Sequence, residues 1–180
     1  MNFSEKTIKE NLLYRGKVLD FYVDDVLLPN GKTAKREIVK HSGGSAVLLE
    51  KDGKVLLVKQ FRYAYKKEIY EIPAGKINKS EQPIETARRE LEEECGYRAD
   101  DLTLLFTMYP STGYTNEIIY IYKAVNPIKT QINLDEDEFL SSKWFEVKEL
   151  KKMIKSGEIC DGKTLLALST IINYKEETEN

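Results

Sequence analysis

The chain has 180 residues, with 28 lysines and arginines against 30 aspartates and glutamates, one histidine and two cysteines. This length predicts one compact domain with room for a small appendage, and the mixed charges argue against a disordered chain. A single histidine and the lack of a CxxC pair exclude a multi-histidine zinc centre, and the sequence contains no GxxxxGK[ST] phosphate loop. Carboxylates remain the abundant reactive groups, and they suit Mg2+ binding or acid–base chemistry.

The same composition predicts a cytoplasmic protein. No apolar run approaches the roughly 20 residues of a membrane helix, and residues 1–13 are too charged for the apolar segment of a signal peptide. Cys95 and Cys160 could form at most one disulfide, which favours a reducing compartment. The net charge of −2 gives no general attraction to polyanions, so we expect neither nucleic acid nor a membrane as a partner.

Residues 12–40 predict a small antiparallel β unit. Apolar residues between 21 and 28 lead into the tight-turn dipeptide Asn30-Gly31, and 33–39 return as a second strand. The small, flexible residues of segment 41–45 then predict a boundary. We therefore expect an N-terminal β subdomain, 1–41, followed by a main domain, 42–180.

The main domain alternates predicted strands and helices. A hairpin at 46–58 turns at Asp52-Gly53, and a strand at 68–72 ends at Pro73-Ala74-Gly75. A helix is predicted at 83–95, and its apolar positions are Ile84, Ala87, Leu91 and Cys95. Further strands are predicted at 102–108, 118–122 and 142–147, and further helices at 148–155 and 163–174. The pattern indicates an α/β layered domain with a mixed β-sheet.

The predicted helix at 83–95 carries three carboxylates beside its apolar face, those of Glu90, Glu93 and Glu94. Like charges at this spacing repel one another, whereas a bound divalent cation would convert the repulsion into coordination. Arg89 is four residues from both Glu85 and Glu93, within reach of each. The simpler alternative is an acidic face that is merely solvated.

The spacing of these residues resembles a known family. Segment 75–97 fits G-x5-E-x7-R-E-U-x-E-E-x-G-U, with U an apolar residue, which is the box of the Nudix hydrolases; only Tyr97 departs from it, replacing an aliphatic residue. The matching residues are Gly75, Glu81, Arg89, Glu90, Leu91, Glu93, Glu94 and Gly96.

Segments outside the box resemble the ADP-ribose pyrophosphatase branch of that family. They are Arg36-Glu37, Gln60-Phe61-Arg62, residues 71–76, residues 110–117 and the acidic loop 135–138. Two positions depart from the branch, because Thr112 and Ser42 stand where proline is common. The resemblance extends over essentially the whole chain, including the N-terminal β unit.

The resemblance implies a Nudix-type α/β/α sandwich with a mixed β-sheet, in which 42–180 form the catalytic domain and 1–41 contribute to a homodimer and to substrate contacts. It implies Mg2+-dependent attack of water on the pyrophosphate of ADP-ribose, giving AMP and ribose 5-phosphate, with Mn2+ as a substitute metal. The implied metal ligands are Glu90, Glu94, Glu138 and the carbonyl of Ala74. The implied catalytic residues are Glu136 as the base, Glu93 as a further ligand or base, and Arg89, which holds the helix in shape. The implied substrate-binding residues are Arg36, Glu37, Arg62, Gly113 and Glu117.

Several alternatives stay open at the level of sequence. The base could be Glu136, Glu138 or Glu93, and the number of metal ions is not defined. The substrate could be another nucleoside diphosphate sugar. A ligand sensor that has lost catalysis is a third possibility, although such proteins typically lose glutamates from the box and this chain keeps each of them.

Overall fold

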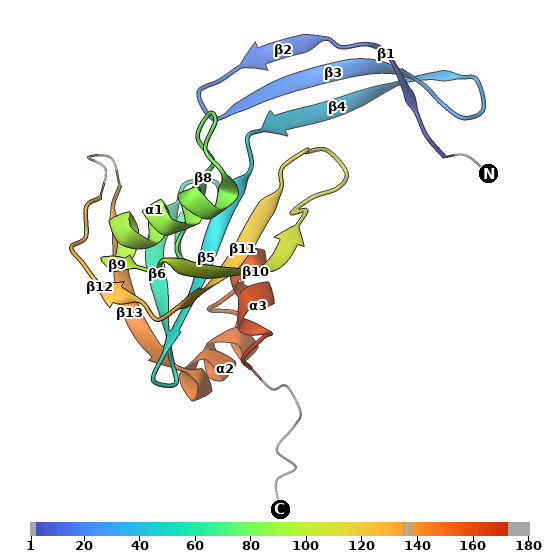
Figure 1. Cartoon of the computed structure of the whole chain (residues 1–180). Coiled ribbons are helices and arrows are strands. Elements are labelled where there is room, and N and C mark those ends of the chain that lie inside the picture. Colours follow the sequence, from blue (N-terminus) through green and yellow to red (C-terminus); the bar gives the residue numbers. More distant parts are fainter. Residues whose placement is uncertain (1–2, 135, 137, 173–180) are drawn as a thin grey trace, which may run out of the picture. The chain divides into compact units, whose positions relative to one another are not determined.

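The computed structural model describes residues 3–134, 136 and 138–172 (Figure 1). Its contacts divide the chain into two compact units. The first unit comprises Met1–Gly43 and Tyr109–Ile118, and the second comprises Gly44–Met108 and Ile119–Asn180. Segment 109–118, which lies far along the chain, is therefore part of the same unit as the N-terminal strands.

The first unit is a four-stranded antiparallel sheet of β1 (Lys6–Lys9), β2 (Leu12–Arg15), β3 (Leu19–Leu27) and β4 (Thr33–His41). The long strand β3 pairs with β4 along its whole length, through the predicted turn at Gly31, whose φ of 79° suits glycine. Strands β1 and β2 pair with successive parts of β3. Segment 109–118 joins β4, where the Val39 N–H donates to the Tyr114 carbonyl at 2.7 Å.

The second unit is built on a mixed sheet with the strand order β10-β11-β5-β6-β13. Its strands are β5 (Gly44–Lys51), β6 (Lys54–Arg62), β7 (Lys67–Glu71), β8 (Ala74–Lys76), β10 (Asp101–Met108), β11 (Ile119–Val125) and β13 (Leu140–Glu146). Strands β5 and β11 are parallel and the other pairs are antiparallel. A separate short pair joins β9 (Tyr97–Arg98) to β12 (Ile128–Lys129).

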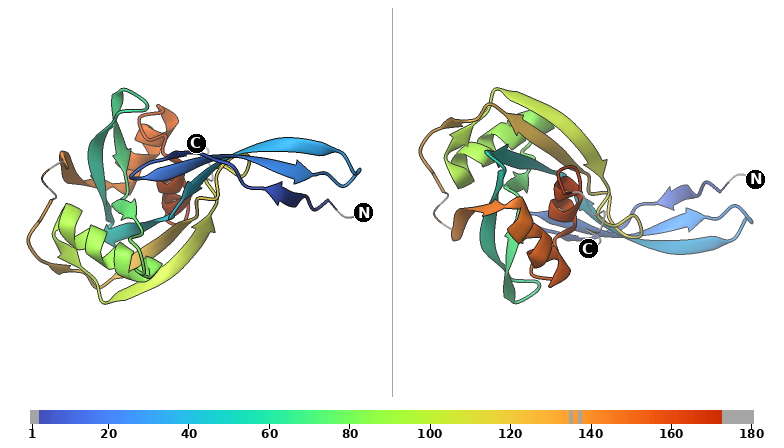
Figure 2. Two further views of the ribbon diagram at one scale, coloured as in Figure 1. Left: turned by 90° about the horizontal axis from the view of Figure 1, so that it is seen from above. Right: turned by 90° about the horizontal axis from the view of Figure 1, so that it is seen from below.

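Helices cover both faces of this sheet. The helices are α1 (Pro83–Cys95), α2 (Val147–Lys155) and α3 (Gly162–Leu168). Because side chains alternate along a strand, Val47 and Leu49 of β5 pack with α1, whereas Ala46 and Leu48 pack with α2 and α3. Figure 2 shows α1 on one side of the sheet and the other two helices on the opposite side. The expected α/β/α sandwich with a mixed sheet is confirmed.

The predicted elements mostly keep their positions, with two corrections. The helix predicted at 163–174 ends at Leu168, and residues 173–174 lie outside the described part of the chain. The segment expected to be flexible, 41–45, lies mainly in β4 and β5. Ser45 is fully buried, and its hydroxyl donates to the Pro83 carbonyl at 2.7 Å, which ties β5 to the start of α1. Within the described residues, no helix has the length and hydropathy needed to cross a membrane.

Candidate active site

Helix α1 begins and ends where local chemistry predicts. The Gln82 N–H, just before the helix, donates to the Glu85 carboxylate at 3.0 Å, and Pro83 occupies the first turn. Gly96 ends the helix in the left-handed conformation with φ of 66°. The apolar face of Ala87, Leu91 and Cys95 packs on the sheet, and this rotation of the helix turns Glu90 and Glu94 toward β8.

Gly75 in β8 makes room for the carboxylate of Glu90. A Cβ atom at position 75 would lie 1.8 Å from Glu90 Oε1, far inside van der Waals contact. Only glycine is therefore compatible with this placement of Glu90. At the adjacent residue, the Ala74 N–H donates to Glu94 Oε2 at 3.1 Å, so β8 approaches both carboxylates.

Glu90 and Glu94 are buried, with 6% and 3% of their surfaces exposed. Burial raises the pKa of Glu90 to about 7, against the opposing charge of Arg89. Burial and the charge of Glu90 raise the pKa of Glu94 to about 8, and Glu138 adds repulsion to both. Two buried carboxylates that resist ionisation in the absence of a cation form a pair suited to receive one.

Arg89 connects the acidic residues around this pair. Its Nε donates to Glu81 Oε1 at 3.0 Å, and its Nη1 lies 2.8 Å from both Glu90 Oε1 and Glu93 Oε2. The expected contact with Glu85 is wrong, because Glu85 instead caps the start of the helix. Arg89 thus holds Glu93 and Glu81 in place while leaving Glu94 without a cationic side chain in hydrogen-bond contact among the described residues.

The donors at this site fit a hard divalent cation such as Mg2+. Glu90 and Glu94 supply carboxylate oxygens, and the Ala74 carbonyl is on the strand beside them. Within residues 3–134, 136 and 138–172, no group of three or more Asp, Glu, His or Cys side chains converges closely enough to hold a metal alone. Glu90 and Glu94 would supply carboxylate oxygens, and water and substrate oxygens would take further positions, as is usual for Mg2+.

The acidic loop at 135–138 is only partly described. Asp135 and Asp137 lie outside the described residues. Glu136 is exposed, and Glu138 is half-buried and close enough to Glu90 and Glu94 to affect both. The assignment of Glu136, Glu138 or Glu93 as the base stays a prediction.

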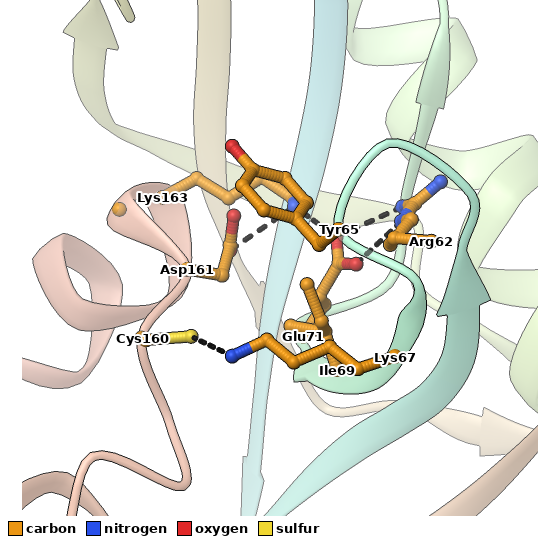
Figure 3. Close-up of a pocket in the computed structure, with 9 residues that line it drawn as sticks. Arg62, Tyr65, Lys67, Ile69, Glu71, Cys160, Asp161 and Lys163 are labelled. Carbon is orange, nitrogen blue, oxygen red and sulfur yellow. Dashed lines mark hydrogen bonds and ion pairs between the residues drawn. The ribbon is translucent and has the colours of Figure 1, made fainter.

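Arg62, at the end of β6, is held by a carboxylate that sequence reasoning missed. Its Nε and Nη2 donate to Glu71 at 2.5 and 2.9 Å. Lys163 Nζ contacts the same carboxylate and lies 3.0 Å from Asp161 Oδ2 (Figure 3). Burial opposes ionisation of Glu71, but Arg62 and Lys163 outweigh it and hold the Glu71 pKa below its usual range. These four residues, which we call the charge cluster, line a pocket of about 500 Å³.

Only part of the charge cluster was readable from sequence. Asp161 accepts a hydrogen bond from the Thr164 N–H at 3.0 Å, a helix cap that an aspartate before a predicted helix could have suggested. The pairing of Lys163 with Glu71 joins residues 92 positions apart, and no local pattern indicates it.

The remaining predicted substrate residues belong to the first unit. Arg36 on β4 pairs with Glu5, with Nε to Oε2 at 2.8 Å. Glu117 Oε1 lies 3.4 Å from His41 Nδ1. Glu37 and Gly113 are exposed, and Gly113 has open space where a side chain would be. Within the second unit the structure therefore brings the acidic residues of α1 together with Ala74. The other four predicted substrate residues, which are Arg36, Glu37, Gly113 and Glu117, lie in the first unit.

Comparisons with known proteins agree with this geometry. The sequence pattern of the NUDIX domain matches residues 39–167. The chain is 46% identical to an ADP-ribose pyrophosphatase of Bacillus subtilis over 170 residues, covering 93% of this chain and 92% of the relative. It is 43% identical to a methanol dehydrogenase activator of Bacillus methanolicus, covering 92% and 91%. A crystal structure of an ADP compounds hydrolase has the same fold, with a TM-score of 0.82 at 18% identity, covering 95% of this chain and 94% of that one. The chain belongs to the NUDIX family.

Proposed function

We propose that this protein is a metal-dependent pyrophosphohydrolase that cleaves ADP-ribose into AMP and ribose 5-phosphate. The observation that carries the proposal is the buried pair Glu90 and Glu94, placed against Gly75 and surrounded by the contacts of Arg89. The similarity to an ADP-ribose pyrophosphatase over more than nine-tenths of both chains supports the choice of substrate.

Each group of side chains has a separate task in this proposal. Glu90, Glu94 and the Ala74 carbonyl hold Mg2+, with Glu138 as an additional carboxylate, and Mn2+ can substitute. The bound metal neutralises charge on the diphosphate and makes water a better nucleophile. Arg62 binds the diphosphate, and Arg36, Glu37, Gly113 and Glu117 contact the rest of the substrate. One of Glu136, Glu138 and Glu93 accepts the proton of the attacking water, and the P–O–P bond breaks to release the two monophosphates.

We further propose that the protein works as a homodimer in the cytoplasm. The N-terminal β unit exposes several large apolar side chains, and exposed apolar surface is typical of protein–protein interfaces. Its exposed residues include Phe3, Ile8, Leu12, Leu13, Tyr14 and Val18. Both cysteines, Cys95 and Cys160, are free thiols, as in proteins of a reducing compartment. Light scattering after size exclusion is expected to give twice the monomer mass, and a monomer would contradict the dimer.

The test of the activity is a substrate panel with purified protein. ADP-ribose, GDP-mannose, UDP-glucose, a diadenosine polyphosphate and NADH are incubated with and without Mg2+, and the products are separated by ion-exchange chromatography. We expect ADP-ribose to give AMP and ribose 5-phosphate only when the metal is present. Faster cleavage of another nucleoside diphosphate sugar would replace the substrate, and tight binding of ADP-ribose without any product would indicate a sensor.

A further inference from the structure

The charge cluster links the start of helix α3, which carries Asp161 and Lys163, to Arg62 on β6 and Glu71 on β7. We propose that Lys163 is a positioning residue for the diphosphate: by sharing Glu71 with Arg62, it keeps the guanidinium fixed yet still attractive to an anion. The inference rests on the proposed function, in which Arg62 binds the diphosphate of ADP-ribose.

The geometry of Arg62 leaves it able to bind a second anion. A guanidinium has five N–H donors, and Arg62 uses one on Nε and one on Nη2 for Glu71, so three remain. The two-point contact fixes the plane of the group, and 40% of the Arg62 side chain stays exposed. Glu71 therefore orients the guanidinium of Arg62 and leaves its other N–H groups available to an anion.

Charge balance explains why a second cation is needed. Glu71 is only 3% exposed, so little solvent screens its charge. Paired with Arg62 alone, that carboxylate would offset most of the positive potential of the guanidinium. Lys163, itself 8% exposed, contacts the same carboxylate and divides its charge between two cations.

Asp161 completes the balance. It accepts from Lys163 Nζ at 3.0 Å, so the charge cluster contains two cations and two anions and is neutral as a whole. Neutralising Lys163 makes the cluster negative, whereas neutralising Asp161 makes it positive. The two changes are therefore expected to move the affinity for an anionic substrate in opposite directions.

The cluster is coupled to the metal-binding carboxylates as well. The charge of Arg62 acts on Glu94, which places the guanidinium within electrostatic range of the predicted metal pair. Helix α3 also supports β7 by a neutral bond, since the Ile72 N–H donates to Thr164 Oγ1 at 2.9 Å. Thr164 Oγ1 also donates to Asp161 Oδ2 at 2.6 Å, so Thr164→Val is a control that removes hydrogen bonds of the same helix without changing the charge of the cluster.

The decisive comparison uses Lys163→Met, Lys163→Arg and Thr164→Val, each checked for folding by circular dichroism. For ADP-ribose hydrolysis with Mg2+, we expect Lys163→Met to raise KM about tenfold with kcat changed less than about twofold. Lys163→Arg keeps the charge and is expected to restore most of the affinity. Calorimetric binding of ADP-ribose in EDTA is expected to weaken in parallel, because the effect does not depend on the metal.

The outcomes separate the inference from the proposed function. If the wild-type protein does not cleave ADP-ribose, the proposed function fails. If it does, but folded Lys163→Met keeps its KM, or Thr164→Val changes KM and kcat as much as Lys163→Met does, the inference alone fails. Should Lys163→Met not fold, Asp161→Asn decides: a lower KM than wild type supports the positioning role, and an unchanged or higher KM overturns it.

Discussion

Glu94 and Glu71 are equally buried, each with 3% of its surface exposed, but their environments have opposite electrostatic effects. The charge cluster surrounds Glu71 with two cations, which hold its pKa below the usual range. Burial and the charges of Glu90 and Glu138 raise the pKa of Glu94 to about 8, and the hydrogen bond from the Ala74 N–H only partly opposes this rise. A buried acid that the protein neutralises with its own cations is a structural element, whereas a buried acid whose ionisation the surroundings oppose is prepared for a cation from outside.

The largest expected effect follows from neutralising Glu94. Glu94→Gln removes a predicted metal ligand, and we expect kcat/KM for ADP-ribose to fall about 10³-fold, or about 4 kcal/mol. Without divalent cations the same variant is expected to melt at a higher temperature than wild type at pH 8, because a destabilising buried charge is gone. Glu92→Gln, on the side of α1 away from β8, is the matched control and should leave activity unchanged. Intact turnover in Glu94→Gln would remove Glu94 from the metal site.

The equivalent substitution at Glu71, which is neutralised by two cations, is expected to lower the stability of the protein instead of raising it. Glu71→Gln leaves the buried Lys163 and the partly exposed Arg62 beside a neutral amide, and we expect the free energy of unfolding to fall by about 3 kcal/mol. Urea denaturation followed by tryptophan fluorescence measures this change. The exposed pair of Lys35 with Asp25 provides the contrast, since Asp25→Asn is expected to leave stability almost unchanged. If Glu71→Gln proves no more harmful than Asp25→Asn, the distinction between the two buried acids collapses.

A backbone position tests how closely β8 must approach the acidic pair. Gly75→Ala would put a Cβ 1.8 Å from Glu90 Oε1 and force that carboxylate to move. We expect kcat/KM to fall about 10²-fold and the Mg2+ concentration for half-maximal activity to rise. Gly162→Ala is the control, because within the described part of the chain a Cβ there would meet nothing within 4 Å apart from its own neighbours along the helix. Equal activities of the two variants would show that Glu90 does not need its present position.

These contrasts also show which parts of the structure could be predicted from the sequence. The bounds of α1 match the prediction because Pro83, Gly96 and the apolar spacing are local properties of 83–95. Strand β1 lies outside the β unit predicted at 12–40, and β2 lies inside it but was not predicted as a separate strand, since all residues of both strands are exposed and show no alternating apolar pattern. The Nudix box located the acidic pair.

The sequence could not reveal which cationic side chains pair with each buried acid. The sequence predicts a role for Arg62 but not its partner, because the register of β6 and β7 places Arg62 opposite Lys67 and Glu71 opposite Val58. The contribution of Lys163 depends on where α3 packs, which is a tertiary property. Burial and partnership decide whether an acid is structural or functional, and neither is a property of the segment that contains it.

The smallest expected effect, a pH dependence of stability, separates the two acids within a single protein. Between pH 5 and pH 8 the unfolded chain ionises Glu94, because the reference pKa of glutamate is about 4.3, whereas the folded chain, with a pKa of about 8, keeps the proton. The folded state then binds more protons, so the metal-free protein loses stability as pH rises through this window. Glu71, with its lowered pKa, is ionised in both states there and contributes no slope; its stabilisation is lost only below about pH 4.5. We expect the melting temperature in EDTA to fall by about 3 °C or more from pH 5 to pH 8, and Mg2+ to restore it at pH 8. Glu94→Gln should reduce the slope and leave the part due to Glu90, whose pKa of about 7 acts in the same direction, and a slope that this variant leaves unchanged would mean that Glu94 does not contribute to it.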